Sequence, residues 1–197
     1  MDTTRFEQGM SYQEFVNTMR QNDRRIKQMY DNYKLTEDDI DRFKTLVGEH
    51  GGKLYITALV EDWCPDVVLN VPLVAHLAEA IDGLELRLFV RPEHEDLKLA
   101  YAAQNVLSIP VISFFNGDWD EVARFVERSA VARAKVIAWT AENYPELDDL
   151  RRSSEPEDRE KLVAIFTKRF SQMVKWYRQG LWRETLNEIE TQLKRGK

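Results

Sequence analysis

The sequence predicts an α/β protein with a mixed central sheet, helices on both faces of that sheet, and extra helices at both ends. Between residues 53 and 90, short apolar runs alternate with a helix-length apolar pattern, which indicates parallel strand pairing. The turn Asn116-Gly117-Asp118 then joins two strand-like segments, which indicates antiparallel pairing. Helical periodicity dominates the two ends of the chain, so the sheet domain carries helical flanks.

Residues 1–52 are predicted to form an N-terminal helical extension. Ser11 and Glu14 have the spacing of a capping box at a helix start. Apolar side chains recur at helical spacing over residues 12–33, which predicts one long helix there. A second helix is expected to begin at Thr36 and to end at His50-Gly51-Gly52.

Residues 53–145 are predicted to form the α/β core. A strand over 53–60 is followed by a helix over 65–81 that is apolar almost all round, so this helix should be mostly buried. Asn70 contributes to its thin polar side, and Pro72 removes a backbone donor and should kink it.

The remaining core elements follow in a fixed order. We expect a strand at 84–90, a helix at 92–104, hairpin strands at 111–115 and 119–127, and a helix at 130–143. The resulting order β-α-β-α-β-β-α implies a mixed sheet covered on both faces.

Residues 146–197 are predicted to form a linker and C-terminal helices that pack on the core. The segment 147–158 is polar and charged and is interpreted as the linker. Two helices follow, separated by Gly180. Their aromatic residues either pack on the core or form a homodimer interface, and the sequence leaves both alternatives open.

Composition argues against nucleic-acid binding, membrane insertion and secretion. The 197 residues are 43% hydrophobic and carry 28 basic and 34 acidic side chains, a net charge of −6, which argues against a nucleic-acid partner. No stretch approaches the roughly 20 apolar residues of a membrane span, and the N-terminus lacks a signal-peptide pattern. A single cysteine suits a reducing compartment, so we expect a cytoplasmic protein without a membrane partner.

That cysteine, Cys64, follows the first predicted strand and opens the first core helix. A helix N-terminus stabilises a thiolate, whereas the nearby carboxylate of Asp66 disfavours it. We predict an exposed thiol with a lowered pKa. The alternative is a small buried hydrophobe, the usual state of a free cysteine.

Three motifs resemble the thioredoxin superfamily. The run Trp63-Cys64-Pro65-Asp66-Val67 resembles its Trp-Cys-x-x-Cys motif, and Pro72 falls at the family's helix-kinking proline. The run Ser108-Ile109-Pro110-Val111 resembles the cis-proline loop. The resemblance covers residues 54–143, and the flanking helices suggest a bacterial thioredoxin-like subfamily with a helical extension.

The resemblance implies a site in which the cis-proline loop lies against a nucleophilic cysteine. The backbone before the proline would pair with an extended substrate chain. On this basis Cys64 is the candidate catalytic residue, and the candidate substrate-binding residues are Trp63, Pro65, Asp66, Ile109 and Pro110.

Two departures from the family pattern limit the chemistry. Val67 occupies the position of the resolving cysteine, and Ala58 occupies the position of a buried acid that relays protons. Cys64 could therefore begin a thiol-disulfide exchange, but an external thiol would have to finish it. Glu61 or Asp62 are weak candidates for a substitute base.

The sequence thus leaves two main functions open. One is a monothiol redox protein acting on protein or low-molecular-weight thiols and disulfides, including glutathione-like ones. The other is a catalytically degenerate binding module in which Cys64 is incidental. A glutathione-binding transferase-like activity is a weaker third interpretation, because the helical regions are short for the second domain it needs.

No metal or cofactor is expected. The histidines at positions 50, 76 and 94 are separated and follow no ligand spacing. Gly51-Gly52 precedes a strand rather than a helix, so these glycines are interpreted as a turn and not as a phosphate-binding loop.

Overall fold

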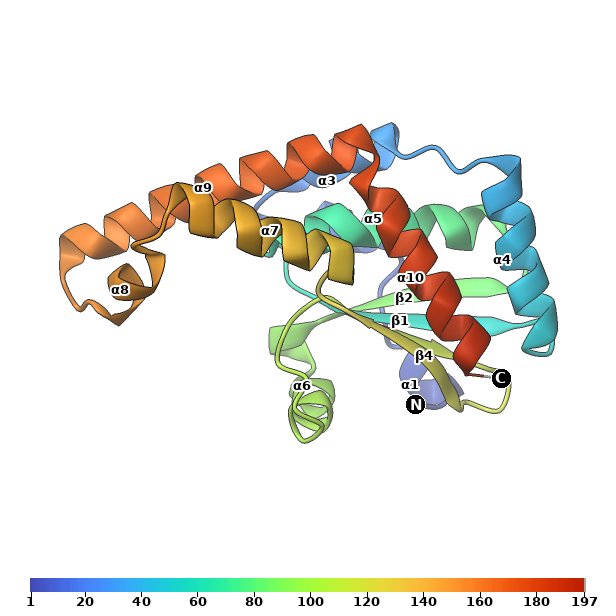
Figure 1. Cartoon of the computed structure of the whole chain (residues 1–197). Coiled ribbons are helices and arrows are strands. Elements are labelled where there is room, and N and C mark those ends of the chain that lie inside the picture. The colour runs from blue at the N-terminus through green and yellow to red at the C-terminus, as the bar shows by residue number, and fades with distance from the viewer. Residues whose placement is uncertain (197) are drawn as a thin grey trace.

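A computed structural model describes residues 1–196 and shows a four-stranded mixed sheet with the strand order β2-β1-β3-β4 (Figure 1). The strands are β1 (Leu54–Val60), β2 (Leu84–Val90), β3 (Val111–Phe115) and β4 (Glu121–Val126). β1 pairs parallel with β2 and antiparallel with β3, and β3 pairs antiparallel with β4. The predicted α/β fold, with parallel pairing first and a hairpin second, is confirmed.

Helices cover both faces of the sheet. On one face lie α5 (Pro65–Ala80), α7 (Ala130–Asn143) and α10 (Trp182–Arg195) (Figure 1). On the other lie α1 (Thr3–Phe6) and α6 (Glu95–Ala102), which follows the short 3-10 turn η1 (Arg91–Glu93). The chain therefore forms three layers, with the sheet in the middle.

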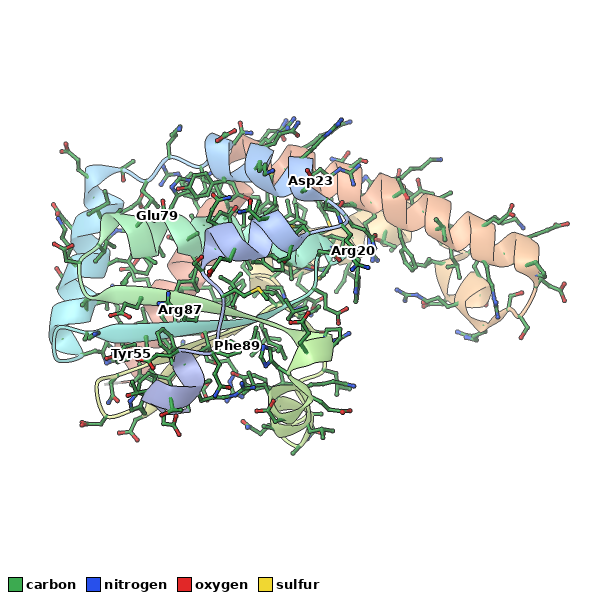
Figure 2. The ribbon with its side chains drawn as sticks, turned by 180° about the vertical axis from the view of Figure 1, so that it is seen from behind. Arg20, Asp23, Tyr55, Glu79, Arg87 and Phe89 are labelled. Atoms are coloured by element: carbon green, nitrogen blue, oxygen red, sulfur yellow. The ribbon has the colours of Figure 1, made fainter. Side chains whose placement is uncertain are left out.

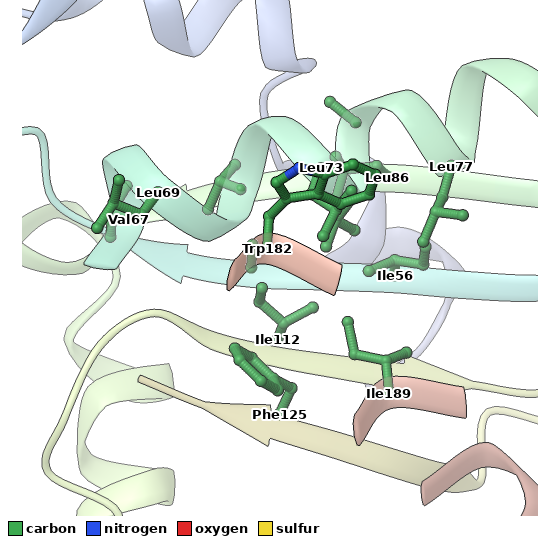
Figure 3. Close-up of a cluster of buried hydrophobic side chains, with 14 of the residues drawn as sticks. Ile56, Val67, Leu69, Leu73, Leu77, Leu86, Ile112, Phe125, Trp182 and Ile189 are labelled. Carbon is green, nitrogen blue, oxygen red and sulfur yellow. The ribbon is translucent and has the colours of Figure 1, made fainter. Parts of the chain in front are cut away.

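Successive side chains of a strand point to opposite faces, so the sheet has a hydrophobic cluster on each face. The larger cluster lies on the α5 face. Along β1, Ile56 and Ala58 join the large cluster with α5, whereas Leu59 joins a smaller cluster under α6. As predicted, α5 is mostly buried, and Pro72 lies inside it. Figure 3 shows that Trp182 and Ile189 of α10 enter the same cluster.

The predicted helix over 12–33 is wrong, because the chain breaks into α2 (Tyr12–Thr18) and α3 (Asp23–Asn32). The carboxylate of Asp62 accepts the backbone N–H groups of Arg20 and Gln21, at 2.8 and 3.0 Å, and so holds the link open. Figure 2 shows Arg20 in this link, beside the start of α3 at Asp23. The long-range contact to Asp62 overrides local helical periodicity.

The other N-terminal predictions hold. Capping boxes are present at Ser11, which begins α2, and at Thr36, which begins α4 (Glu37–Glu49). The N-terminal segment also covers the edge of β2, since Met10 exchanges two backbone hydrogen bonds of 2.8 Å with Leu88. α3 is tied to α5 by a bond of 2.6 Å from the Tyr33 hydroxyl to the Leu69 carbonyl.

The C-terminal segment differs from the prediction in one element. The expected linker at 147–158 contains a short helix, α8 (Leu147–Arg152), because Leu147 and Leu150 pack against Ile165 of α9 (Pro156–Trp176). The predicted break at Gly180 is present: this residue has φ 107° inside the π-turn η2 (Tyr177–Leu181), which favours glycine. α10 then returns across β4 (Figure 1).

The longest helix, α9, has 21 residues, and charged side chains recur along its length. It projects beyond the sheet together with α8 (Figure 1). None of the helices described here is apolar over a length that would cross a membrane.

Candidate functional site

Cys64 is the N-cap residue of α5, directly after the loop that leaves β1. The backbone N–H groups of Asp66 and Val67 point at its sulfur. The residue is nevertheless only 5% exposed, and its thiol donates a hydrogen bond of 3.4 Å to the Ile109 carbonyl. The prediction of an exposed thiol is therefore wrong, and the alternative of a buried cysteine describes the structure.

The predicted lowering of the Cys64 pKa is also wrong. Burial, and secondly the Asp66 carboxylate, raise the pKa of the thiol to about 12, against opposition from the two backbone N–H groups and from Arg128. A helix N-terminus stabilises an anion by only about 0.3–1 kcal/mol, whereas burial shifts a pKa by up to several units. Desolvation wins, so Cys64 is a neutral thiol at neutral pH.

The loop opposite the thiol has the predicted geometry. The Ile109–Pro110 peptide bond is cis, and both residues are buried beside Cys64. The Pro110 carbonyl accepts the Glu127 N–H at 2.9 Å, which joins the loop to the end of β4. The Ile109 N–H has no hydrogen-bond partner in the described part of the chain.

The rim of the site is apolar. Trp63, a candidate substrate-binding residue from the sequence, is 47% exposed, and its indole N–H donates to the Glu61 carboxylate. Pro65 occupies the first turn of α5 and is half-buried. Leu107, which the sequence analysis missed, is 74% exposed and lines the same cavity. Its place directly before the run Ser108-Ile109-Pro110-Val111 is the sequence signal that could have identified it.

Asp66 faces inward. Its carboxylate is held by both nitrogens of the Arg128 fork, with 2.8 Å between Nε and Oδ1, and the residue is 3% exposed. Burial raises the pKa of the Asp66 carboxyl, and the Arg128 guanidinium opposes that rise. The carboxylate forms an internal ion pair that locks the start of α5 to the residue after β4.

Asn70 is a buried hub that sequence reasoning assigned to the polar side of α5. Its amide nitrogen donates to the carbonyls of Asp66 and Glu127, at 2.9 and 3.1 Å. Its oxygen accepts from the hydroxyls of Tyr177, at 3.2 Å, and Thr185, at 2.8 Å. One side chain thus joins α5 to the β4–α7 link and to the C-terminal helices.

The acids before Cys64 already have partners. Glu61 pairs with Arg91 as well as with the Trp63 indole, and Asp62 accepts the two backbone N–H groups of the α2–α3 link. Neither carboxylate hydrogen-bonds the sulfur. Val67 and Ala58, which replace the resolving cysteine and the relay acid, are completely buried.

A cavity of about 240 Å³ that opens to solvent lies beside the Cys64 thiol. Helix α9 contributes part of its wall, which no local sequence pattern predicts. The lining includes both rim residues, the cis-proline loop, the acid–arginine pair and three residues of α9: Trp63, Leu107, Ile109, Asp66, Arg128, Arg169, Phe170 and Met173.

No three metal-binding side chains come together anywhere in residues 1–196. Each of the three histidines contacts a polar group of the protein through a ring nitrogen. His50 and His76 bond to the carbonyls of Leu193, at 3.0 Å, and Tyr30, at 2.7 Å, and His94 contacts the Arg5 guanidinium at 3.1 Å.

A helix that begins at a cysteine, a cis-proline loop that faces this cysteine, and a β-α-β-α-β-β-α order define a protein of the thioredoxin fold. A family model described as thioredoxin matches residues 9–143. The chain belongs to this thioredoxin family. The match begins well before β1, so it includes the N-terminal helices that cover α5.

Two solved structures resemble the chain. An HIV epitope scaffold is 17% identical with a TM-score of 0.57, covering 85% of this chain and 99% of its own. A protein of unknown function from Pseudomonas aeruginosa is 18% identical with a TM-score of 0.54, covering 83% of this chain and 95% of its own. At these identities the likeness shows the fold alone. A search of curated proteins found no match.

Proposed function

We propose that this protein is a thioredoxin-fold binding module that docks an extended segment of a partner protein beside the cis-proline loop. The observation that carries the proposal is the burial of Cys64, whose thiol is bonded to the Ile109 carbonyl. Thiol-disulfide exchange needs a thiolate with access to a disulfide sulfur. A pKa of about 12 leaves almost no thiolate at neutral pH.

The rim supports docking. Trp63 and Leu107 expose apolar surface on the cavity that the cis-proline loop borders. An extended chain added along this loop would pair its backbone with the Ile109 N–H, and its alternate side chains would contact the two rim residues. Binding by this route uses exposed side chains and one backbone donor, and it does not use the sulfur.

Affinity purification with three forms of the protein tests the proposal. Cys64→Ser should retain the same partner proteins as wild type, because serine keeps a donor for the Ile109 carbonyl. The double variant Trp63→Ala, Leu107→Ser should lose them, since it removes the apolar rim. Retention by the double variant, or loss with Cys64→Ser alone, would contradict the proposal.

Monothiol exchange is the second candidate, favoured by the Asp66 and Val67 N–H groups at the sulfur and by the cavity beside it. In this reaction the Cys64 thiolate attacks a substrate disulfide. A mixed disulfide forms as the substrate S–S bond breaks, and the released thiolate takes a proton. An external thiol then reduces the mixed disulfide. A Cys64 adduct found by mass spectrometry in non-denatured protein would support this candidate over the binding module.

The location, the oligomeric state and the three-part division of the chain are also proposals. We propose a cytoplasmic protein, because a lone cysteine suits a reducing compartment. Size-exclusion chromatography with light scattering would test the homodimer that the C-terminal aromatic residues suggest.

A further inference from the structure

A second cavity, of about 600 Å³, lies between α7, α8, α9 and the link that follows β4. Four arginines line it: Arg128, Arg133, Arg151 and Arg169. This concentration of positive charge stands out on a chain whose net charge is −6. Two of these arginines, Arg128 and Arg169, also line the cavity beside Cys64, so the two cavities are neighbours.

Three of the four arginines have carboxylate partners. Arg128 pairs with Asp66, Arg133 pairs with Glu127 at 2.6 Å, and Arg151 pairs with Asp148 at 3.2 Å.

Arg169 is the exception. Its guanidinium lies 4.8 Å from the Phe166 ring, and no carboxylate of residues 1–196 is within ion-pair distance of it. The cavity therefore holds one guanidinium in excess of its internal ion pairs.

A partly buried guanidinium without an ion pair is unfavourable inside a protein. Partial burial, and secondly the neighbouring charges of Arg128 and Arg151, lower the pKa of Arg169. A second polar group is also unsatisfied: the Thr140 hydroxyl of α7 lines the cavity and is buried without a hydrogen-bond partner. Unpaired polar groups inside a protein destabilise it, so a donor-rich cavity of this kind is suited to an acceptor that comes from outside.

Besides the carboxylates of Glu127 and Asp148, which pair with Arg133 and Arg151, the rest of the lining is mainly apolar. Val136, Ile137, Tyr144 and Leu147 form walls on α7, on the turn after it and on α8. The volume lies in the range of small-molecule sites, which combine apolar walls with a few polar groups. Guanidinium groups bind carboxylates and phosphates through paired hydrogen bonds.

We propose that this cavity binds a small organic anion, with its carboxylate or phosphate on Arg169 and its apolar body against α7 and α8. The single guanidinium without an ion pair can bind one oxyanion. The apolar side chains of the walls suit a ligand whose remaining part is uncharged. Binding does not depend on whether Cys64 reacts.

Calorimetric titration of the full chain with benzoate and with phenyl phosphate tests the site and separates the two oxyanions. We expect saturable binding at millimolar concentration for at least one of them, and none for uncharged benzamide. Arg169→Met should weaken that binding by at least about tenfold, because the variant keeps most of the apolar stem and loses the paired donors.

The matched control is Arg159→Met, on the same helix but exposed and outside the lining. It should bind like wild type, and far-ultraviolet circular dichroism should show that both variants are folded. Absence of saturable binding by both anions would overturn the proposal. Equal binding by Arg169→Met, or equal binding of benzamide, would overturn it as well.

Discussion

Two neighbouring cavities share Arg128 and Arg169: the cavity beside Cys64, called the thiol site, and the cavity between α7, α8 and α9, called the arginine cavity. They differ in whether their polar groups have partners within the protein. At the thiol site, Cys64 bonds to a carbonyl, and Asp66 is held by the Arg128 fork. In the arginine cavity, no carboxylate of the described residues lies within ion-pair distance of Arg169, and the Thr140 hydroxyl has no hydrogen bond.

The difference shows where each region can meet a ligand. The polar groups at the start of α5 are satisfied internally, so they stabilise the fold and leave little for chemistry. Between α7 and α9, the Arg169 guanidinium has no ion pair and the Thr140 hydroxyl has no hydrogen bond, so the anion that we propose would give these two groups a partner. Four measurements test whether the two regions differ in this way.

The largest effect is expected for Arg128→Met. It leaves the Asp66 carboxylate buried without its partner, which should lower the free energy of unfolding by about 3–5 kcal/mol. Urea denaturation of both proteins measures this loss. Arg133→Met is the control, since its pair with Glu127 is half exposed, and it should cost less than about 1 kcal/mol. Equal losses would show that the Asp66 pair is not special.

Asn70→Ala should have the next largest effect. The substitution removes partners from the Glu127 carbonyl and from the hydroxyls of Tyr177 and Thr185, so we expect a loss of about 2–4 kcal/mol. Urea denaturation again gives the value. Asn143→Ala removes one exposed hydrogen bond, from the side-chain amide to the Trp139 carbonyl, and its free energy of unfolding should stay within about 0.5 kcal/mol of wild type. An unpaired buried polar group costs at least about 1 kcal/mol. A smaller loss for Asn70→Ala would therefore mean that water takes over the hydrogen bonds of the Asn70 side chain.

The third effect depends on pH. The pKa of Cys64 is about 12 in the folded protein but near 8.5 in an unfolded chain, so only the unfolded state loses the proton between these values. The resulting stabilisation is fully present below about pH 8.5 and is lost as the pH rises toward 12. Wild type should therefore lose stability more steeply than Cys64→Ala, by about 1.4 kcal/mol per pH unit at most.

Urea denaturation of wild type and Cys64→Ala at about pH 8, just below the unfolded pKa, and at about pH 10, between the two pKa values, measures this difference. The alanine variant cancels the contributions of the buried tyrosines, which both proteins share. Parallel pH profiles would show that the thiol is not buried in solution.

The smallest effect is expected for Arg169→Met without ligand. Removing a partly buried charge that has no ion pair should change the free energy of unfolding by less than about 1 kcal/mol, and in the stabilising direction. Thermal denaturation in a buffer without carboxylate or phosphate measures it. A loss of several kcal/mol would mean that Arg169 has a structural role, and the contrast with Arg128 would disappear.

Much of the fold follows from local patterns. The alternation of strands and helices and the Asn116-Gly117-Asp118 turn indicate the parallel and the antiparallel pairing of the sheet, and the capping boxes mark the starts of α2 and α4. The helix break near Arg20 and the α8 helix were not predictable, because each depends on a contact with a segment distant in sequence or on packing against a neighbouring helix.

The candidate site shows the same division. The resemblance to the thioredoxin superfamily correctly predicted a cis Ile109–Pro110 bond beside Cys64 at the start of the first core helix. It missed Leu107, Arg128 and Asn70, since none of them belongs to a motif.

The thioredoxin fold, and the single cysteine without a resolving partner at the start of the first core helix, follow from the amino-acid sequence alone. The burial of this cysteine and its raised pKa follow from packing in three dimensions. Desolvation of the thiol explains the raised pKa. The solvent exposure of a side chain is set by what packs over it, and here the cis-proline loop and α9, both distant in sequence, surround the thiol.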